Sequence, residues 1–453
     1  MKVVITYGVF DLYHKGHENL LRRAKALGDK LIVGVTSNSF TRERGKLLLA
    51  DSLDTRMNNV RNCEYVDEVI LEDHYGQKIE DIQKYGVDIF VAGDDWEGQF
   101  DYLKEWCDVV YLPRTPGISS SSLRNSPNPE VIIGVIGNGR IAARFIEEAR
   151  AVRGGVRIRY VYNPHLKSAQ DFAEDHEGLA AVEDLEEFLS AVDAVYIASP
   201  HETHYGYAMQ AIKHGKHVLC EKPMALSGRE AEDLFAAADE NNVILMEAIK
   251  TAYCPGFIKM IAVVKSRFIG DIVDVESCFT RLIPGKGREW TGEYGGSFIE
   301  TASYTLLPIL KILGTENLEV RFQSVFNGDG QDIYTKTFLS NPNGQMGLAK
   351  NGLGAKSEGQ LIVAGTEGYM LAEAPWWKTT RFEIRREDTS LSKAFGVEFE
   401  GEGLRYELAE FIERIQGWHS SDYLLRRSES IRIASIIEQF IRYRKETVMA
   451  QDL

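Results

Sequence analysis

Two histidines stand three residues apart near the start of the chain, in the run Tyr7–His17. They follow a short β-branched segment and directly precede a stretch with helical spacing. The first turn of a helix offers unpaired backbone N–H groups and a partial positive charge, so a triphosphate can bind there. Gly16 lets backbone and phosphate approach closely. His14 and His17 can donate hydrogen bonds to an α-phosphate while pyrophosphate is displaced. A pair of capping or surface histidines is the alternative.

A glycine turn marks a second candidate site, in the run Val131–Ala142. Gly137 permits a tight turn, Gly139 permits close approach of a pyrophosphate, and Ala142 permits packing of the helix on its strand. This strand–turn–helix context favours a dinucleotide site over a simple tight turn.

The end of the next predicted strand bears on the choice of cofactor. Asn163 stands where an acidic residue normally binds the ribose 2′-hydroxyl. An acid there would repel a 2′-phosphate, so its absence permits NADP(H) as well as NAD(H). His165 and Lys167 could pair with that phosphate, although Lys167 could equally be a solvated helix residue.

Polar residues follow two later strands and recur further along the chain. Ser199–His201 ends one strand, and Cys220–Pro223 ends another. Lys222 could act as an acid or a base if burial lowers its proton affinity. Glu300 and Tyr304 are four residues apart, so they face the same way on a helix and could bind substrate and pass a proton. A structural role for Tyr304 in the core remains the alternative.

Residues 1 to about 124 resemble the glycerol-3-phosphate cytidylyltransferase family nearly from end to end. The matching stretches are Tyr7–His17, Tyr65–Ile70, Gly93–Gly98 and Arg114–Ser119. The resemblance implies phosphate contacts by the two histidines, and CTP as donor with Mg²⁺. The residues it implies for the site are Gly8, Phe10, Asp11, His14, Gly16, His17, Lys46, Arg56, Asp94, Trp96, Arg114, Thr115, Ser119 and Ser120, with His14, His17, Lys46 and Arg114 catalytic. Pro116 replaces the usual Glu, so the acceptor alcohol is left open.

Residues from about 130 onwards resemble the Gfo/Idh/MocA oxidoreductase family, whose Glu-Lys-Pro signature is intact at Glu221–Pro223. The resemblance implies that Lys222 lies near the nicotinamide and the substrate hydroxyl. Glu300 and Ala302 replace the family's usual Asp and Gly, and the acid–base assignment between Lys222 and Tyr304 stays open. The implied cofactor-binding residues are Gly137, Asn138, Gly139, Arg140, Ile141, Asn163, Ser199, Pro200, His201, His204 and Glu221, and the catalytic ones are Lys222, Glu300 and Tyr304. Gly365–Tyr369 and Pro375–Trp377 resemble the family's C-terminal sheet and are predicted to be structural.

The elements that must position these residues alternate between strand and helix twice. Alternation of this kind predicts parallel βαβ units. The expected strands of the first stretch are Lys2–Tyr7, Lys30–Thr36, Tyr65–Leu71, Val87–Ala92 and Val109–Leu112, with a first helix over Glu18–Leu27. Those of the second are Val131–Ile136, Arg157–Tyr162, Ala194–Ala198, His217–Leu219 and Val243–Met246.

After about residue 250 the predicted strands are separated by few helices, which favours a mostly antiparallel open sheet. These strands are Asp271–Arg281, Leu318–Phe326, Asp332–Phe338, Met346–Lys350, Gly359–Ala364 and Thr380–Arg385, before a final helix over Ser428–Tyr443. The turn-rich segment Ser119–Pro129 separates the two alternating stretches. We therefore predict an α/β chain with a nucleotidyltransferase domain at 1–126, a dinucleotide-binding Rossmann domain at 127–250, and an α+β domain at 251–453 for substrate binding and oligomerisation.

Composition limits the class of protein. The formal net charge of −15 argues against nucleic acid or an anionic membrane as a partner. The sequence shows neither a signal peptide nor an apolar run of roughly 18 residues, and its five cysteines are too widely spaced for a zinc site or a disulfide framework. A cytoplasmic protein is expected, and both resembled families suggest a homo-oligomer.

Together these features predict a bifunctional enzyme that reduces a ketose phosphate, for example fructose 6-phosphate, with NAD(P)H and couples the alditol phosphate to CMP from CTP. One alternative keeps the transferase and makes the second half a non-catalytic or separately acting module. Another has the oxidoreductase act on the CDP-linked product or on an unrelated sugar.

Overall fold

The chain divides into two compact units. Unit 1 comprises residues 1–129 with 416–421, and unit 2 comprises residues 130–415 with 422–453. The computed structural model describes residues 2–11, 13–43, 49, 51–74, 76–94, 98, 100–113, 130–152, 155–284, 287–416 and 424–451. The predicted boundary at 126/127 lies outside the described residues.

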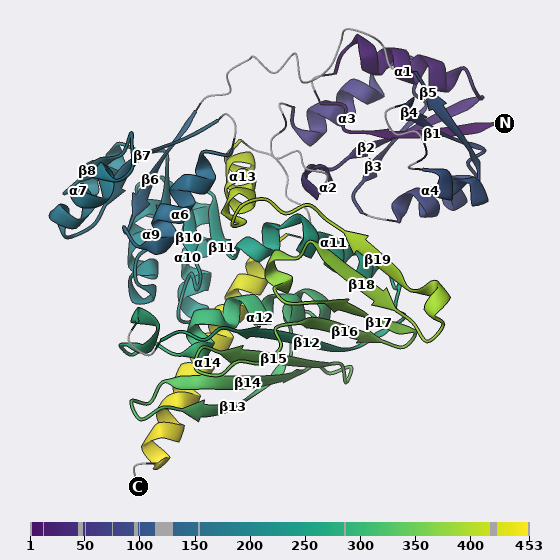
Figure 1. The fold of residues 1–453 in the computed structure, drawn as a ribbon. Coiled ribbons are helices and arrows are strands. Elements are labelled where there is room, and N and C mark those ends of the chain that lie inside the picture. Colours follow the sequence, from purple (N-terminus) through teal and green to yellow (C-terminus); the bar gives the residue numbers. More distant parts are fainter. Residues whose placement is uncertain are drawn as a thin grey trace. The chain divides into compact units, whose positions relative to one another are not determined.

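Unit 1 is built on a five-stranded parallel sheet of order β3-β2-β1-β4-β5 (Figure 1). Alternate residues of its strands face opposite sides: Val4 packs with Leu21 of the helix α1, and Ile5 packs with Ile82 of α4. Helices therefore cover both faces, which is why the strands read as continuous apolar runs. The elements are β1 Val3–Gly8, α1 Lys15–Lys25, β2 Lys30–Thr36, α2 Asn38–Glu43, α3 Leu53–Arg61, β3 Glu68–Glu72, α4 Gln77–Tyr85, β4 Ile89–Gly93, the 3₁₀ turn η2 Asp101–Glu105 and β5 Asp108–Leu112.

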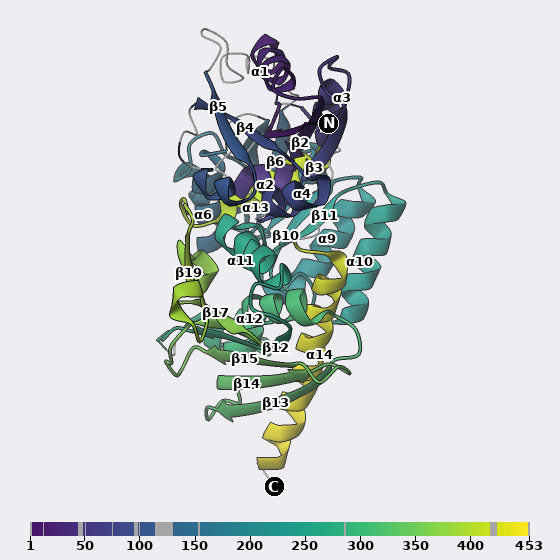
Figure 2. The ribbon, with the colours of Figure 1, turned by 90° about the vertical axis from the view of Figure 1, so that its right-hand side faces the viewer.

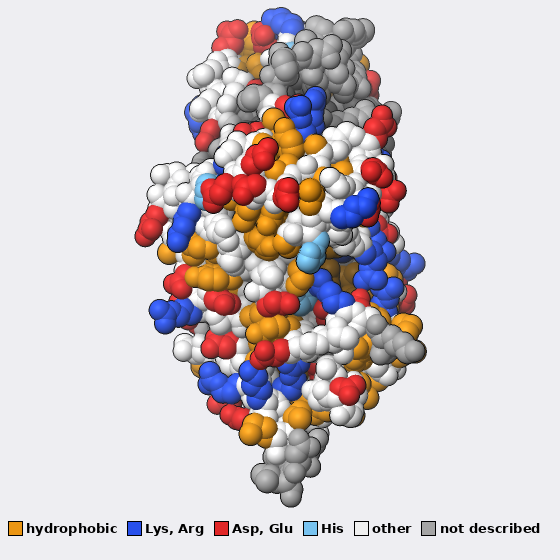
Figure 3. Space-filling view, turned by 90° about the vertical axis from the view of Figure 1, so that its left-hand side faces the viewer, with side chains coloured by type: hydrophobic (Ala, Val, Ile, Leu, Met, Phe, Trp, Pro, Cys, Tyr) orange, Lys and Arg blue, Asp and Glu red, His pale blue; other side chains and the backbone are white. Residues whose placement is uncertain are grey.

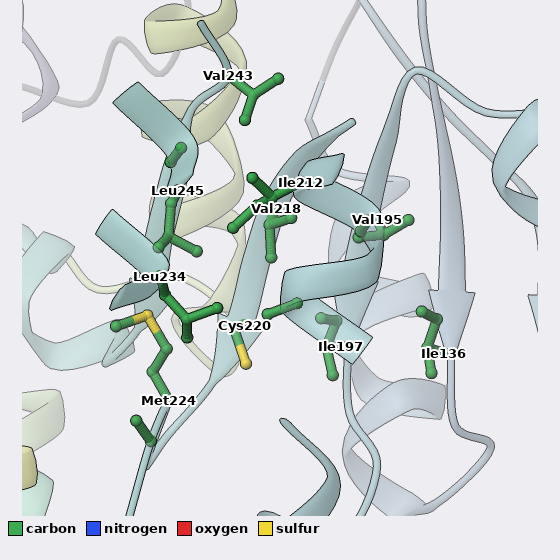
Figure 4. Packing of buried hydrophobic residues seen from close by; sticks show 14 of the residues in the cluster. Ile136, Val195, Ile197, Ile212, Val218, Cys220, Met224, Leu234, Val243 and Leu245 are labelled. Carbon is green, nitrogen blue, oxygen red and sulfur yellow. The ribbon is translucent and has the colours of Figure 1, made fainter. Parts of the chain in front are cut away.

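Unit 2 begins with a six-stranded parallel sheet of order β11-β10-β9-β6-β7-β8. Val195, Val218 and Leu245 of its strands share a buried cluster with Ile212 of α9 and Leu234 of α10 (Figure 4). The elements are β6 Val131–Ile136, α6 Arg140–Ala149, β7 Val156–Tyr162, α7 Leu166–Glu174, β8 Ala180–Val182, α8 Leu185–Ser190, β9 Ala194–Ile197, η3 His201–Thr203, α9 His204–Lys213, β10 His217–Glu221, α10 Gly228–Glu240 and β11 Leu245–Ala248.

An eight-stranded sheet of order β13-β14-β15-β12-β16-β17-β18-β19 follows within unit 2. Its neighbouring strands are antiparallel except for the parallel pair β12 and β15. The elements are η4 Lys250–Tyr253, α11 Pro255–Lys265, β12 Ile272–Thr280, η5 Arg288–Trp290, α12 Ser297–Leu313, β13 Glu319–Phe326, β14 Asp332–Ser340, β15 Met346–Gly352, β16 Leu361–Gly365, β17 Gly368–Ala372, η6 Trp376–Lys378, β18 Arg381–Arg385, η7 Thr389–Leu391, β19 Lys393–Gly396, α13 Leu404–Ile415 and α14 Arg427–Gln451.

The long helix α14 packs against elements on both sheets of unit 2. It packs against α10 beside the parallel sheet and against α12 on the eight-stranded sheet, and Figure 2 shows it running past both. Phe298 of α12 lies 5.5 Å from Phe322 of β13 and 4.4 Å from Phe440 of α14, between ring centroids. Because such rings bury large apolar areas, this contact stabilises the helix that carries Glu300 and Tyr304.

The start of α12 is fixed by an aspartate from a distant strand. Asp332 accepts a hydrogen bond from the backbone N–H of Phe298 at 2.9 Å, and Ser297 Oγ donates to the Asp332 carbonyl at 2.9 Å. Gly296 has φ 120°, and a Cβ atom there would lie 2.2 Å from Asp332 Oδ1. Only glycine fits this approach, so the first turn of α12 is held in one position.

The structure confirms the predicted fold class, with parallel sheets in the first two stretches and a mostly antiparallel sheet after residue 250. Several boundaries were wrong. The first helix runs over Lys15–Lys25, with His14 as its N-cap residue and His17 in its first turn. The last helix runs over Arg427–Gln451. The strands β8, β17 and β19 were missed: β8 has three residues, β17 follows β16 directly in a hairpin, and β19 is a largely exposed edge strand.

The described surface mixes charges of both signs. On the face in Figure 3, acidic, basic and hydrophobic side chains are interspersed, and Lys and Arg side chains gather at the right-hand side of the view. Among the described helices, none is long and apolar enough to cross a membrane. All five cysteines are free thiols.

Candidate active sites

The turn after β1 brings the two histidines together at the first turn of α1. His14 is the N-cap residue, and its Nδ1 accepts a hydrogen bond from the backbone N–H of Gly16 at 3.0 Å. His17 Nδ1 accepts from the backbone N–H of His14 at 3.4 Å, and the two rings stack with centroids 4.0 Å apart. Because both Nδ1 atoms are acceptors, each neutral imidazole carries its proton on Nε2 and donates from that atom. The histidines cap the helix, and the same tautomer can serve a phosphate.

The backbone of this turn is tightly packed. Phe10 adopts φ 55° and is buried, and a Cβ atom on Gly8 would lie 2.9 Å from its ring. Asp11 is also buried, and its Oδ1 accepts from the backbone N–H of Asp51 at 3.0 Å. These contacts fix the path of the chain into α1.

Arg56 forms hydrogen bonds with the backbone of this turn. Its completely buried guanidinium donates to the carbonyl oxygens of Val9 at 2.6 Å and Thr36 at 2.8 Å, which joins the turn to the end of β2. Asp94 directly follows β4, the strand paired with β1, so it lies at the same carboxyl edge of the sheet as the histidines. The remaining predicted residues of this site lie outside the described residues: Lys46, Trp96, Arg114, Thr115, Ser119 and Ser120.

The glycine turn of unit 2 has the shape that a dinucleotide requires. Gly137 has φ 100°, and a Cβ atom there would lie 2.6 Å from the carbonyl oxygen of Ala198. Gly139 is the N-cap residue of α6, and a Cβ atom built on it meets nothing within 4 Å. The backbone is therefore open to a pyrophosphate at the start of α6, where Arg140 and Ile141 follow.

A neutral hydrogen-bond network lies at the end of β7. Asn163 Nδ2 donates to Asn138 Oδ1 at 2.8 Å, and Asn138 Nδ2 donates to Ser168 Oγ at 2.6 Å. His165 is the N-cap residue of α7, and Lys167 forms an ion pair with Asp171 at 2.6 Å. Asn138 and Asn163 thus lie together at the end of β7, and Lys167 already has a carboxylate partner one helical turn away.

The parallel sheet and the eight-stranded sheet of unit 2 both contribute to the walls of an open cavity of about 560 Å³. It begins at the glycine turn and is lined by residues from both sheets. The lining residues are Gly139, Arg140, Ile141, Arg144, Ala198, Ser199, His201, His204, Glu221, Lys222, Lys250, Phe279, Arg281, Ile283, Arg288, Glu289, Glu300, Thr301, Tyr304, Leu353, Trp377, Lys378 and Glu402.

Lys222, His201 and Glu300 meet in this cavity from three separate elements. Lys222 Nζ donates to the backbone carbonyl of Glu300 at 2.9 Å and lies 3.8 Å from its Oε2. His201 Nε2 lies 2.9 Å from Glu300 Oε1. Burial raises the pKa of Glu300, but the hydrogen bond from His201 and the charge of Lys222 outweigh it and hold that pKa at about 2. Glu300 is therefore ionised throughout the neutral range.

Tyr304 lies one turn further along α12, on the same face. Its ring stacks on Phe279 with centroids 5.3 Å apart, and Phe279 packs against Trp377 at 4.2 Å. Lys222 Nζ lies 5.8 Å from the Tyr304 ring centroid. Burial and the negative charge of Glu221 raise the pKa of Tyr304 well above its usual value. The phenol therefore keeps its proton and can donate it or share it with a substrate oxygen.

Two further predicted residues, Glu221 and His204, form polar contacts near Lys222. Glu221 Oε1 accepts from Tyr196 OH at 2.7 Å, and burial raises the pKa of Glu221. His204 Nδ1 lies 2.8 Å from the carbonyl oxygen of Pro223, and its Nε2 lies 2.9 Å from that of Ser199. Burial lowers the pKa of His204 to about 4, so the neutral ring donates through one nitrogen only. His204 therefore donates to one of these two carbonyl oxygens and only lies close to the other, between the ends of β9 and β10. Pro200 opens the 3₁₀ turn between Ser199 and His204.

Two family models match the chain, one over each nucleotide site. Residues 5–126 match the cytidylyltransferase-like family, and residues 131–249 match the oxidoreductase family with an NAD-binding Rossmann fold. Over 124 residues the chain is 52% identical to glycerol-3-phosphate cytidylyltransferase of Bacillus spizizenii, covering 27% of this chain and 95% of that protein. The chain is a fusion of a glycerol-3-phosphate cytidylyltransferase family member with a Gfo/Idh/MocA family oxidoreductase.

The oxidoreductase half of the fusion has longer, more distant relatives. It is 26% identical over 322 residues to trans-1,2-dihydrobenzene-1,2-diol dehydrogenase of Sus scrofa, covering 68% of this chain and 94% of that one. A 3-ketoreductase from Actinomadura kijaniata, solved with NADP and TDP-benzene, shares the fold with a TM-score of 0.60 and 23% identity, over 69% of this chain and 96% of that one. The predicted class is confirmed: the fusion is a cytidylyltransferase and an NAD(P)-dependent oxidoreductase.

The structure of the fusion adds cavity residues that the sequence motifs did not reveal. Phe279 and Arg281 lie at and just after the end of β12, Arg288 opens η5, and Lys250 opens η4. Trp377, which was predicted to be structural, also lines the cavity beside Phe279. In the sequence, these residues are marked only by a charged or aromatic side chain near the end of a strand or turn. Such residues are too common to indicate a site.

Proposed function

We propose that the fusion makes a CDP-alditol in two steps. Unit 2 reduces the carbonyl group of a ketose phosphate, and unit 1 then couples the alditol phosphate to CMP from CTP with release of pyrophosphate. The observation that carries the proposal is the convergence of Lys222, Glu300 and Tyr304 in one cavity, in a chain whose other half belongs to a family that activates a polyol phosphate. Fusion raises the local concentration of the intermediate. Fructose 6-phosphate, giving a mannitol or sorbitol phosphate, is the specific candidate.

In the reduction, a reduced nicotinamide cofactor supplies the hydride when it is bound along the Gly137–Gly139 turn. Lys222 and Tyr304 hold the carbonyl oxygen by hydrogen bonds, and one of them transfers a proton to it, which solvent later replaces. Glu300 stays ionised and fixes Lys222 through its backbone carbonyl and its charge. The carbonyl carbon thus gains a hydride and its oxygen a proton, so the ketone becomes an alcohol.

In the transfer, a phosphate oxygen of the alditol phosphate attacks the α-phosphorus of CTP, and the bond to the pyrophosphate oxygen breaks. His14 and His17 donate from Nε2 to the oxygens that become more negative. In this proposal, Lys46 and Arg114 are catalytic residues near the reacting phosphates, and Mg²⁺ is bound together with CTP. Within the described residues, no group of three or more His, Cys, Asp or Glu side chains forms a metal site.

NADP(H) is the proposed cofactor rather than NAD(H). The end of β7 offers the neutral amide of Asn163 in place of a carboxylate, so a 2′-phosphate meets no like charge there. The related 3-ketoreductase of known structure was solved with NADP. We place the enzyme in the cytoplasm as a homo-oligomer, with residues 1–126, 127–250 and 251–453 as its domains and a surface polysaccharide as the destination of its product.

A one-pot reaction tests the pathway. The purified full-length protein is incubated with CTP, Mg²⁺, NADPH and a panel of ketose phosphates, and the products are identified by mass spectrometry. We expect a CDP-alditol that disappears when either CTP or NADPH is omitted. A protein that never oxidises NADPH or NADH with any sugar phosphate contradicts the proposal, and transfer to ready-made alditol phosphates would then leave unit 2 as a non-catalytic module.

A Lys222→Ala variant separates the two steps. Formation of the CDP-alditol from an alditol phosphate should be unchanged, because that reaction needs unit 1 alone. Formation from the ketose phosphate should be lost. A variant that still reduces the ketose at the wild-type rate would exclude Lys222 from the reaction, and reduction of a CDP-linked compound in preference to the ketose phosphate would reverse the order of the steps.

A further inference from the structure

The cavity of unit 2 is basic, although the whole chain carries a formal net charge of −15. Its described walls contain more Lys and Arg side chains than Glu side chains. The basic residues are Arg140, Arg144, Lys222, Lys250, Arg281, Arg288 and Lys378, and the acidic ones are Glu221, Glu289, Glu300 and Glu402. A recess of this kind focuses a positive potential and attracts an anion.

Several of these cations already have acidic partners. Arg140 pairs with Glu289 at 3.1 Å, and Lys378 pairs with Glu402. Lys222 lies 3.8 Å from a Glu300 oxygen. Of the acidic residues in the described lining, Glu289, Glu300 and Glu402 therefore each lie beside one of these cations.

Other cations in the lining make no such pair. Lys250 donates to the backbone carbonyl of Glu402 at 2.8 Å. Arg144, Arg281 and Arg288 form no ion pair with any carboxylate of the described residues. An unpaired guanidinium beside a cavity is available for an anionic ligand.

Two arginines of the segment between β12 and α12, Arg281 and Arg288, lie on the side of the cavity where the substrate would react. Arg281 follows β12, the strand that carries the Phe279 ring stacked on Tyr304. Arg288 opens η5, and its charge contributes to the low pKa of Glu300. Arg144, in contrast, lies on α6, one turn after Arg140 and beside the dinucleotide turn, so we assign it to the cofactor side.

The backbone that carries the two arginines is anchored. Arg281 donates from its N–H to the carbonyl of Gly352 at 2.8 Å. Across the loop, Trp290 of η5 donates from Nε1 to the carbonyl of Ile283 at 3.2 Å. Both guanidinium groups therefore extend from fixed points, which reduces the entropy lost when they bind an anion. Two guanidinium forks suit the three terminal oxygens of a phosphate better than two ammonium groups do.

We propose that Arg281 and Arg288 bind the phosphate group of the ketose whose carbonyl is reduced beside Lys222 and Tyr304, so that the site selects phosphorylated substrates. This inference rests on the proposed function and deepens it. A terminal phosphomonoester and the diphosphate of a CDP-linked sugar share the same chemistry, and the two are distinguished below. Of the two, the proposal commits to the monoester.

Initial rates test the subsite in the full-length protein. Arg281→Gln, Arg288→Gln and the double variant are compared with wild type on fructose 6-phosphate and fructose at saturating NADPH. Loss of a charge-assisted hydrogen bond predicts a roughly 10- to 100-fold fall in kcat/KM for the phosphorylated sugar per arginine, mostly through KM. The preference for fructose 6-phosphate over fructose should collapse in the double variant. Inorganic phosphate should compete with fructose 6-phosphate in wild type but not in the double variant.

Arg229→Gln is the matched control, because Arg229 is a largely exposed arginine of α10, 3.9 Å from Asp233 and away from the cavity lining. It should leave the preference unchanged. Wild-type selectivity that persists in the double variant overturns the subsite while leaving the proposed function intact. Variants that lose activity only with a CDP-linked sugar overturn the monoester assignment.

A binding measurement covers the case in which no ketose is reduced. Calorimetric titration of fructose 6-phosphate into the NADP⁺-saturated protein should show binding that Arg229→Gln retains and the double variant lacks. Equal binding by the double variant and wild type contradicts the subsite whatever the turnover. Absence of turnover with retained, arginine-dependent binding contradicts the proposed reduction alone.

Discussion

Replacing Gly137 by alanine should damage unit 2 in a way that its neighbour Gly139 does not. Gly137 has φ 100°, which costs an L-residue with a side chain roughly 1–2 kcal/mol. The new Cβ atom would also lie 2.6 Å from the carbonyl oxygen and 2.8 Å from the carbonyl carbon of Ala198. These are backbone atoms at the end of β9, so the turn or the strand must shift, and overpacking of this kind costs roughly 1–3 kcal/mol.

The two costs add to roughly 2–5 kcal/mol. For a unit of this size, that lowers Tm by roughly 3–8 °C. Dinucleotide binding should weaken as well, because Ser199 follows Ala198 directly and lines the cavity. Cytidylyl transfer to an alditol phosphate depends on unit 1 and should be retained at temperatures where both units are folded.

Gly139→Ala is the control for this prediction. Gly139 has φ −82°, which any residue adopts, and its Cβ atom would meet nothing within 4 Å. Its Tm should match that of wild type, while the affinity for NADPH, measured by fluorescence titration, falls because the added methyl group occupies the approach of the pyrophosphate. Thermal unfolding of the two variants decides the matter. Equal melting of Gly137→Ala and wild type, or equal destabilisation by both substitutions, would refute the reasoning.

Three further outcomes follow from the geometry. Tyr304→Phe should lower kcat of the reduction about 100-fold or more if the phenol delivers the proton; a fall below tenfold in stopped-flow NADPH oxidation assigns that role to Lys222. His17→Gln should lower the rate of CMP transfer about 100-fold while NADPH oxidation is unchanged, and equal loss of both activities would contradict separate sites. Burial raises the pKa of Glu247 from 4.5 to about 7, which is equivalent to roughly 3 kcal/mol. The protonated Glu247 carboxyl therefore contributes its full stability below pH 4.5, and this stability is lost as the pH rises through 7. Melting curves of Glu247→Gln should therefore lack part of the wild-type decline between pH 5 and 8, and an unchanged decline would exclude this carboxyl.

The sequence predicted the parallel sheets well because their strands are buried on both faces. Val4 and Ile5 each meet a helix from opposite sides, so the whole strand reads as apolar. The eight-stranded sheet gave weaker signals at its edge. The strand β19 pairs with a single neighbour and is largely exposed, so Lys393–Gly396 has no apolar period to recognise.

The motifs placed the glycine turns, the histidines and Lys222, because each has a local geometric reason to occupy its position in the chain. They could not show that His201 and Glu300, which are 99 residues apart, form a pair. They also could not show that Arg281 and Arg288 line a basic cavity without an ion pair to any carboxylate of the described residues. Such facts depend on which strand ends meet across two sheets, and no periodicity in the chain encodes that meeting.

Glu300 and Ala302, the two departures from the family pattern on α12, motivate the alternative in which the second half is non-catalytic. The structure accommodates both. The longer side chain of Glu300 reaches His201 at 2.9 Å while its backbone carbonyl holds Lys222 at 2.9 Å. Ala302 is completely buried on the helix between Glu300 and Tyr304, so its methyl group packs in the core. Because both substitutions keep the polar groups converging on the cavity, they favour a retained reaction with an altered substrate over a lost one.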